Sequence, residues 1–408
     1  MVKPGFGKLA SLDEAMKILV SNINIKGMEP VKLEDSLGRI LAEDVIAPID
    51  VPHFDKSAMD GYAVISQDSF GASNTSPKTL KLIGSVLPSQ VFERKIISGE
   101  CVEIATGAPL PDGTDAVLMV EYTERTDNYI ACYKSVAPGE NIIKIGSDVK
   151  KGEKILIKQT TISPRQLGVL AALGISQLMV IQKPKVAVLT TGSEIIKQGE
   201  KLEKGKVYDI NSQTLSSALK ENNCEVINLG FVPDEFEIIK DRIIEGIEKS
   251  DIILLSGGSS LGAGDLIIEV LNELGKILIH GIAVKPGKPT IIAKIKNKLV
   301  IGLPGHPASC LSNFYILIFP ILRKMSGSRC QIPERYIEAI LTRKVASTIG
   351  RYEFLAVKIS QKADKIYAEP VMKGSSAITS LAEASGFVGI EENVEVLEKG
   401  EVVKVRLF

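Results

Sequence analysis

Between residues 185 and 325, short runs rich in apolar residues alternate with segments of helical periodicity. The runs are 186–189, 226–229, 252–255 and 298–301, and the helical segments are 211–222, 235–249, 266–274 and 308–325. Apolar runs without polar alternation are typical of strands that are buried on both faces. Strands that alternate with helices in this way predict a doubly wound, mostly parallel α/β sheet.

The chain before this region has a different pattern. Residues 11–22 predict an amphipathic helix, with Ser11 as N-cap and Glu14 at capping-box spacing. From about residue 28 to 160, short apolar runs such as 81–85 and 90–97 alternate with Gly, Pro, Asn and Asp turns. Helical periodicity is scarce there, so we expect mostly strands and loops.

Two further elements complete the pattern. Ser163 and Pro164 are typical of a helix start, and the helix is expected to run through Leu173. Residues 333–408 return to alternating apolar and polar positions, which predicts a small β-barrel or sandwich. The chain is therefore expected to combine α/β and β-rich domains.

Composition narrows the class of protein. At 408 residues, with 45% hydrophobic and 24% charged residues, the chain is expected to form a globular protein of about two to four domains. The chain has 49 lysine and arginine residues and 49 aspartate and glutamate residues, so its formal net charge is zero. The net charge therefore does not favour binding to nucleic acid or to a membrane surface. The five cysteines are scattered and no apolar run is long enough to span a membrane, which predicts a cytoplasmic protein with reduced thiols.

Polar residues gather where the predicted parallel strands end. In an open α/β sheet, ligands bind beyond the carboxyl ends of the strands. Gly- and Ser-rich turns there let backbone N–H groups approach an oxyanion beside a helix N-terminus. We therefore predict a pocket for a phosphorylated ligand. Its candidate ligands in these turns are Ser256, Gly257, Gly258, Ser259, Ser260, Gly262, Pro304, Gly305, His306 and Ser309.

Two lysines lie between these turns on a Pro-Gly-Pro loop. Lys285 and Lys288 could be an ordinary solvated pair, but the neighbouring Pro286 and Pro289 restrict the backbone and favour binding of one anion by both ammonium groups. Because lysines on such a loop are poor core residues, we expect them to act on charge and not on folding.

Carboxylates also lie at the predicted strand ends. Glu194 and Asp265 are candidate Mg²⁺ ligands, since Mg²⁺ usually takes one or two carboxylates together with substrate phosphate oxygens and water. Asp265 is expected directly before a helix. Asp234 is a further candidate, although it or Glu235 could simply cap the helix that follows. His53 and His280 lack partners at metal-ligand spacing, which argues against zinc.

Two clusters in the N-terminal half have no evident chemistry by themselves. Residues 50–64 read DVPHFDKSAMDGYAV and residues 104–111 read IATGAPLP. The first is typical of a polar loop that enters a strand, and the second of a Gly/Pro turn. Neither contains a known phosphate cradle or catalytic triad, so from the residues alone both are interpreted as structural.

Taken together, these segments closely resemble the molybdopterin molybdenumtransferase family, which includes bacterial MoeA and the E domain of gephyrin. The resemblance runs from about residue 8 to the C-terminus, with the clusters in family order. Its segments are 50–64, 105–111, 139–148, 191–194, 209–212, 256–265, 285–289 and 304–309.

The resemblance implies four domains per subunit. These are a linking domain (28–46 and 152–174), an inserted β-rich signature domain (47–151), an α/β molybdopterin-binding domain (8–27 and 175–330) and a C-terminal β-barrel (333–408). It also implies an elongated homodimer, with each active site between the α/β domain of one subunit and the signature domain of the other. Asp60, Thr106 and Asp148 thereby become candidate active-site residues beside Glu194 and Asp234.

The reaction implied by the resemblance is insertion of molybdate into adenylylated molybdopterin with release of AMP, dependent on Mg²⁺. The adenylyltransferase of the preceding step is an expected partner. Two alternatives stay open: an adenylyltransferase-like enzyme, or a non-catalytic dimeric scaffold. The sequence does not distinguish molybdate from tungstate as the natural oxyanion substrate. Gly281 stands where some family members carry a basic residue, and His280 could replace that contact; His306 stands where many have Asn.

Overall fold

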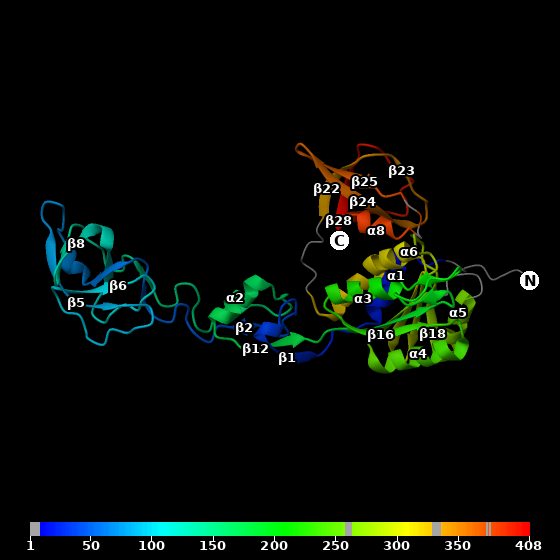
Figure 1. Cartoon of the computed structure of the whole chain (residues 1–408), viewed down its shortest axis with the longest axis horizontal. Helices are drawn as coiled ribbons and strands as arrows, with labels where there is room; N and C mark the ends of the chain where they lie inside the picture. The colour runs from blue at the N-terminus through cyan, green and yellow to red at the C-terminus, as the bar shows by residue number, and fades with distance from the viewer. Residues whose placement is uncertain (1–8, 258–262, 329–335, 373, 375–376) are drawn as a thin grey trace, which may run out of the picture.

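The computed structural model describes residues 9–257, 263–328, 336–372, 374 and 377–408, with the backbone alone for 263–265. The chain is elongated (Figure 1). A β-rich unit, here the distal unit, lies at one end and is joined through a smaller linking unit to an α/β unit. A second β-rich unit lies beside the α/β unit (Figure 1).

The α/β unit is built on one six-stranded sheet of mixed direction. Its strands, in spatial order, are β16 (Glu225–Val232), β13 (Lys185–Thr191), β17 (Ile252–Gly257), β21 (Lys298–Leu303), β20 (Ile291–Ile295) and β18 (Lys276–His280). The first four run parallel, β20 runs antiparallel to both of its neighbours, and β18 has the direction of the first four again. The expected mostly parallel sheet is confirmed, although the one reversed strand, β20, was not predicted.

Helices cover both faces of this sheet because its strands are apolar on both sides. Along β13, Val186 and Val188 face one core while Ala187 and Leu189 face the other. The first core is closed by α1 (Leu12–Ser21), α3 (Asn211–Glu221), α6 (Pro307–Asn313) and α7 (Phe319–Met325). The second is closed by α4 (Phe236–Lys249) and α5 (Ala263–Leu274).

Two helix predictions are refined by the structure. The Ser11–Glu14 capping box is present, with the Glu14 amide donating to Ser11 Oγ at 3.1 Å and the Ser11 amide to Glu14 Oε2 at 2.9 Å. The predicted helix at 308–325 is interrupted by a π-helical segment, Phe314–Ile318, between α6 and α7.

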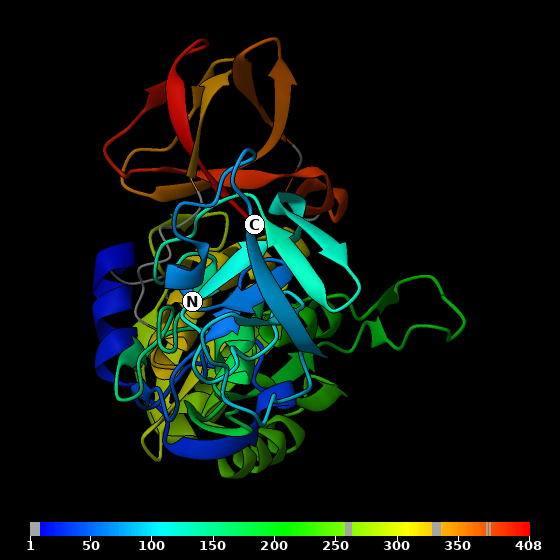
Figure 2. The same ribbon diagram turned by 90° about the vertical axis from the view of Figure 1, so that its left-hand side faces the viewer.

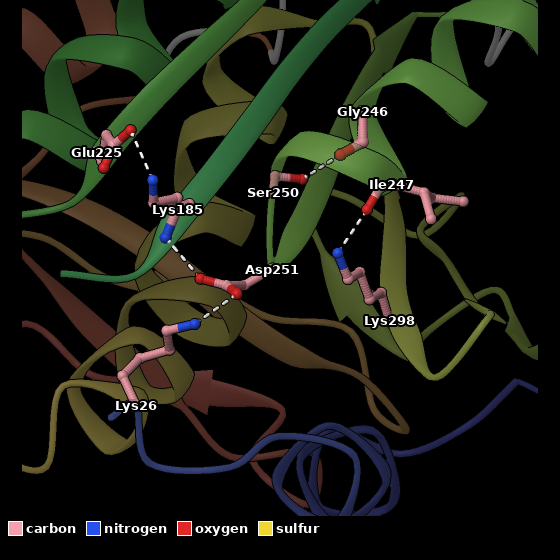
Figure 3. Close-up of polar contacts among 8 residues, drawn as sticks. All are labelled: Lys26, Lys185, Glu225, Gly246, Ile247, Ser250, Asp251 and Lys298. Atoms are coloured by element: carbon pink, nitrogen blue, oxygen red, sulfur yellow. Dashed lines mark hydrogen bonds and ion pairs between the residues drawn. The ribbon is translucent and has the colours of Figure 1, made fainter. Parts of the chain in front are cut away.

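Ion pairs and hydrogen bonds join the amino-terminal ends of the parallel strands, as Figure 3 shows. Asp251 accepts the Lys26 ammonium at 2.6 Å and the Lys185 backbone N–H at 2.8 Å. Lys185 also pairs with Glu225 at 3.2 Å, and Lys298 Nζ donates to the carbonyl of Ile247. These contacts lie at the amino-terminal ends of the strands, whereas a ligand is expected at the carboxyl ends.

The distal unit contains a second six-stranded sheet. Its spatial order is β7 (Ala116–Met119), β4 (Gly61–Val64), β6 (Glu100–Ile104), β5 (Lys78–Val86), β9 (Tyr129–Cys132) and β8 (Thr123–Thr126). A short pair, β3 (Lys56–Ser57) with β10 (Ile142–Ile143), lies outside it. The predicted run 81–85 lies in β5, but 90–97 forms no strand. Residues 90–97 form a loop, and Ile96 is the only large side chain of this loop that is fully buried, so it fixes the loop to the core of the unit.

The linking unit pairs early and late segments of the N-terminal half. Strand β1 (Met28–Lys32) pairs with β12 (Gln177–Ile181), and β2 (Val45–Ile46) pairs with β11 (Lys154–Leu156). Helix α2 (Pro164–Ala172) starts at the Ser163 cap, as predicted. The distal unit is thus inserted into the linking unit, and the chain passes from the linking unit to the distal unit and later back again (Figure 1).

The C-terminal strands close into a barrel. Strand β24 (Tyr352–Lys362) pairs with both β25 (Lys365–Pro370) and β26 (Gly386–Ile390), and β22 (Tyr336–Leu341) and β28 (Val402–Leu407) complete the ring. Of the two predicted alternatives, the barrel is confirmed. The pair β23 (Val345–Ala346) and β27 (Val396–Leu397), and helix α8 (Thr379–Glu383), complete the unit.

Viewed along the long axis, the barrel lies above the α/β unit, and a segment around β14 (Ile195–Ile196) and β15 (Val207–Tyr208) projects to one side (green in Figure 2). No helix among the described residues is long and apolar enough to cross a membrane.

Candidate functional site

The strand ends that carry the predicted ligand residues lie side by side. In the sheet register, Thr191 is paired with Gly257 and Ser256 with Leu303, so the carboxyl ends of β13, β17 and β21 are neighbours. The sequence separates Thr191 from Leu303 by more than a hundred positions, and only strand pairing brings them together. The predicted convergence of these strand ends is confirmed.

Asn211, the first residue of α3, connects these turns. Its Nδ2 donates to Ser256 Oγ at 2.8 Å and to the Gly305 carbonyl at 2.7 Å. Its Oδ1 and the hydroxyl of Thr191 are buried and have no hydrogen-bond partner among the described residues. Buried polar atoms are rarely left unpaired, so unpaired ones at a strand-end edge indicate a polar ligand.

Asp209 is a buried carboxylate beside this cluster. Its Oδ1 accepts the Ser212 N–H at 3.0 Å and its Oδ2 accepts the Ser212 hydroxyl. Thr190 Oγ1 lies 3.5 Å from the same carboxylate. Asp209 therefore satisfies a free N–H in the first turn of α3 and holds Asn211 in place.

Gly257 ends β17 in a conformation that other residues rarely adopt. Its φ is +124°, and a Cβ built there would lie 1.9 Å from the Thr191 carbonyl oxygen. Only glycine permits so close an approach of the two turns. The backbone of strands β13 and β17 therefore defines one wall of the site.

The lysine loop packs against the helix that follows the third turn. A Cβ on Gly287, whose φ is +117°, would lie 2.4 Å from the Asn313 amide. Asn313 Nδ2 donates to the Gly287 carbonyl at 3.0 Å and to Thr290 Oγ1 at 2.6 Å. Asn313 and Thr290 are fully buried. The loop 285–289 is thus held rigidly beside α6.

Lys285 has a partner that the sequence did not indicate. Its Nζ lies 3.1 Å from Oε2 of Glu353, a barrel residue that is only 8% exposed. Ser347 Oγ donates to the same oxygen at 2.8 Å. This ion pair changes the expectation that Lys285 acts on charge alone, because removing the lysine leaves a nearly buried carboxylate without its counter-charge.

The candidate metal ligands lie on adjoining turns. Asp234, after β16, donates its N–H to Ser193 Oγ at 3.4 Å, next to the exposed Glu194. One carboxylate oxygen of Asp234 is buried without a hydrogen-bond partner in the described part of the chain. Glu235 occupies the N-cap position of α4 but makes no side-chain cap bond, so the capping alternative finds no support there.

Asp265 does not precede the helix, as was expected, but lies inside the first turn of α5. Helical periodicity was recognised only from Leu266, whereas Ala263 and Gly264 already belong to the helix. The side chain of Asp265 lies outside the description. Within the described residues, no three His, Cys, Asp or Glu side chains gather closely enough to hold a metal by themselves.

The remaining predicted anion ligands are distributed around the same edge. Pro304 and Ser309 are buried, and His306 is exposed at the start of α6 without a side-chain cap bond. Lys288 is half-buried, and its carbonyl accepts the Ile282 N–H at 2.9 Å. Gly258, Ser259, Ser260 and Gly262 lie outside the described residues.

Asp60 and Thr106 are brought together in the distal unit. Asp60 Oδ1 accepts the Thr106 backbone N–H at 2.7 Å and the Thr106 hydroxyl at 2.8 Å. These two bonds, the backbone one first, lower the pKa of Asp60 below its ordinary value. Both residues are exposed. The result is a fixed, ionised carboxylate beside a depression of about 300 Å³.

Backbone hydrogen bonds join the two N-terminal clusters to segment 139–148. The Ser57 N–H donates to the Ala108 carbonyl at 3.0 Å, and the Ala58 N–H to the Asn141 carbonyl at 2.9 Å. The Asp148 N–H donates to the Val51 carbonyl at 3.1 Å, and the Asp148 side chain is exposed. Segments 50–64, 105–111 and 139–148 therefore form one continuous surface.

The two groups of predicted residues lie far apart within one chain. Asp60 and Thr106 belong to the distal unit, whereas the strand-end cluster belongs to the α/β unit at the other end (Figure 1). A cavity of about 440 Å³ lies elsewhere, between the linking unit, the α/β unit and the barrel, and Phe319 and Arg323 of α7 and Arg406 of the barrel are among the residues that line it. None of the predicted site residues lines that cavity.

Of the cysteines in the described part of the chain, none has a thiol suited to attack a substrate at the strand-end cluster. Cys310 lies there, 3.6 Å from Ser256 Oγ, but its burial raises the pKa of the thiol to about 12. A thiol with that pKa is protonated at neutral pH and is a poor nucleophile. The groups available to contact a ligand are therefore the unpaired polar atoms of Thr191 and Asn211 and the ammonium of Lys285.

Sequence reasoning missed several residues of this site. Asp209 and Asn211 stand in one of the family-like segments but were not chosen, because their partners lie far along the chain. Asn313 and Thr290 look like ordinary polar positions. Glu353 carried no signal, since it lies in a strand of another unit.

Comparisons with known proteins cover the same regions. Residues 10–174 match the MoeA N-terminal region (domain I and II), 187–324 a probable molybdopterin binding domain, and 338–408 the MoeA C-terminal region (domain IV). The chain is 34% identical over 404 residues to the molybdopterin molybdenumtransferase of Haemophilus influenzae, covering 98% of this chain and 99% of that one. It is 31% identical over 408 residues to the Bacillus subtilis enzyme of the same name, and this alignment covers 97% of this chain and 94% of that one.

Solved structures agree with these matches. A structure titled as a molybdopterin biosynthesis MoeA protein from Pyrococcus horikoshii has a TM-score of 0.86 and 42% identity, covering 98% of this chain and 99% of its own. A second structure with that protein name, from the same species, has a TM-score of 0.83 and 34% identity, covering 98% and 100%.

Proposed function

Since this chain belongs to the MoeA family of molybdopterin molybdenumtransferases, we propose that it inserts molybdenum from molybdate into adenylylated molybdopterin and releases AMP. The observation that carries this proposal is the strand-end cluster, where unpaired buried polar atoms and the close approach at Gly257 occur together. Lys285 lies on the loop that is held beside α6, the helix that follows the third strand end. Such a site suits a ligand with several oxyanions.

The residues of the cluster would bind and orient the anionic groups. The backbone at Gly257 would let a phosphate or molybdate oxygen approach closely, and Lys285, on the loop beside α6, would contribute a positive charge. Thr191 Oγ1 can donate to an oxyanion, whereas Asn211 Oδ1 can only accept, from an N–H or O–H of the ligand. Charge that develops on the leaving AMP phosphate would be stabilised by the donors and by the lysine, without a covalent enzyme intermediate.

Mg²⁺ fits the donor set on the adjoining turns. Asp234, with its unpaired buried oxygen, and Glu194, on the next turn, are the two described carboxylates that would hold it. Two carboxylates suffice, because Mg²⁺ usually completes its shell with substrate oxygens and water. Bound there, the ion would supply positive charge to a phosphate oxygen.

The Asp60–Thr106 pair is proposed to complete the site from a second subunit. The elongated chain separates the pair from the strand-end cluster, so both can act on one substrate only if two chains associate. An antiparallel, two-fold homodimer would place the distal unit of each chain beside the α/β unit of the other. Asp60 would accept a proton or orient an attacking oxygen, and Asp148, on the same surface, is a further candidate.

The domain division inferred from the sequence is retained as a proposal: 28–46 with 152–174, 47–151, 8–27 with 175–330, and 333–408. A cytoplasmic location and transfer of substrate from the adenylyltransferase of the preceding step are likewise proposed.

The deciding assay supplies purified protein with adenylylated molybdopterin, molybdate and Mg²⁺ and measures AMP. We expect AMP release that requires molybdate, and Asp60→Ala should abolish it while Asp112→Ala, an exposed carboxylate of the same unit, should not. In a second reaction that supplies molybdopterin and ATP instead, consumption of ATP to form the adenylylated substrate would favour the adenylyltransferase alternative. Binding without turnover would favour the scaffold.

Mixing two inactive variants tests the shared site. Asp60→Ala and Lys285→Ala damage opposite ends of the chain, so each heterodimer would retain one intact site. Random exchange of subunits makes about half of the dimers heterodimers, each with one intact site of two. About a quarter of wild-type activity should therefore return if the sites are shared between subunits. Activity that stays absent after verified exchange, or a monomer mass by light scattering with full activity, would contradict the shared site.

A further inference from the structure

Glu353 approaches the lysine loop through strand pairing between two units. Strand β19 (Val284–Lys285) of the α/β unit runs parallel to β24 of the barrel, and Lys285 is the register partner of Glu353. The Tyr352 N–H donates to the Ala283 carbonyl at 2.9 Å, which fixes this pairing. The carboxylate therefore reaches Lys285 from a part of the chain that contributes no other predicted ligand.

The carboxylate is held more firmly than the lysine. The Glu353 side chain is 11% exposed and its Oε2 accepts from both Lys285 Nζ, at 3.1 Å, and Ser347 Oγ, at 2.8 Å. The Lys285 side chain is 40% exposed. A cavity of about 470 Å³ lies beside the pair and is lined by residues of both units, including Pro286, Ala308 and Phe354.

A lysine side chain has several rotatable bonds, and ordering it on a ligand costs conformational entropy. A partner that is already fixed by its own hydrogen bond limits this freedom before the ligand arrives. The ammonium has three N–H donors, so one can be held by Glu353 while the others face an anion. The negative charge of Glu353 also repels that anion, and the two effects oppose each other.

We propose that Glu353 is a positioning residue for anion binding: from the neighbouring barrel it holds the Lys285 ammonium, on the loop beside α6, at the cavity that both residues line. This inference rests on the proposed function, since Lys285 must contact a substrate oxyanion for its position to matter. The barrel thereby takes part in the site through the lysine and not through direct contact of Glu353 with substrate.

Two substitutions separate position from charge. Glu353→Gln retains an acceptor for Lys285 and an amide that can bond Ser347, but removes the charge. Glu353→Ala removes both. The wild type, Gln and Ala variants are titrated with molybdate by calorimetry, next to melting curves, and Glu338→Gln serves as control because that exposed barrel residue carries the same charge.

We expect Glu353→Gln to bind molybdate at least as tightly as the wild type, because a repulsive charge is lost. Glu353→Ala should bind roughly three- to tenfold more weakly than Glu353→Gln, the range expected for ordering one long side chain. In a Lys285→Ala background the two variants should bind equally. KM for molybdate should follow the same order, with kcat changed less.

Equal molybdate affinity of the Gln and Ala variants with Lys285 intact would overturn the proposal. A difference between them that persists without Lys285 would also overturn it and assign Glu353 a structural role. Failure of the proposed function is distinguishable: the wild type would then release no AMP, and Lys285→Ala would leave molybdate binding unchanged.

Discussion

Replacing Gly257 by Ala tests whether the close approach of two turns forms the wall of the site. The added Cβ would lie 1.9 Å from the Thr191 carbonyl oxygen and 2.8 Å from Thr191 Oγ1. Because real Cβ contacts essentially never fall below 3.0 Å, the backbone of one strand end has to move by about 1 Å. That movement disrupts the last register pair between β13 and β17.

The expected cost can be worked from these two effects. The φ of +124° is unfavourable for alanine by about 1–2 kcal/mol. Loss of the end pairing adds about 1–2 kcal/mol, the range for one disturbed buried hydrogen bond. Together they amount to about 2–4 kcal/mol, or a fall in melting temperature of roughly 5–15 °C for a unit of this size.

A matched control isolates the clash from the backbone strain. Gly205 has a φ of +88° but nothing within 4 Å of a built Cβ, so Gly205→Ala should cost only about 1 kcal/mol. Melting is followed by scanning calorimetry, and AMP release is measured below the transition. Equal melting temperatures for the two variants would refute the reasoning, as would full activity of Gly257→Ala.

Three further outcomes follow from contacts at the two clusters. Lys285→Ala should destabilise the protein by about 1–2 kcal/mol in thermal melts, less than for a fully buried pair because the lysine is 40% exposed, and adding Glu353→Gln should recover part of the loss. Thr106→Val should raise the pKa of Asp60 only part of the way to its ordinary value of 3.8, since the backbone donor remains, as NMR titration would show. Any stability from that carboxylate is present above pH 3.8 and is lost as pH falls through its lowered pKa. Cys310, with its raised pKa of about 12, should resist iodoacetamide at pH 8 until the protein unfolds, as peptide mass spectrometry would reveal.

The patterns that depend on neighbours in sequence were readable without the structure. Apolar runs such as 186–189 are strands because both faces are buried, and the Ser11–Glu14 capping box forms within a single helical turn. Helix α5 shows the limit, since its first turn, including Asp265, carries no apolar periodicity.

Contacts between distant segments were decided only by the tertiary structure. Asp60 meets Thr106 because strand pairing in the distal unit closes segment 50–64 on the turn at 105–111. Lys285 meets Glu353 because a two-residue strand adds to the barrel. The local sequence determines which residues prefer a turn, a helix or a buried strand, because those preferences arise within a few residues of backbone. Which polar atoms then share one site depends on the strand register and on unit packing, and those are fixed by burial summed over the whole chain.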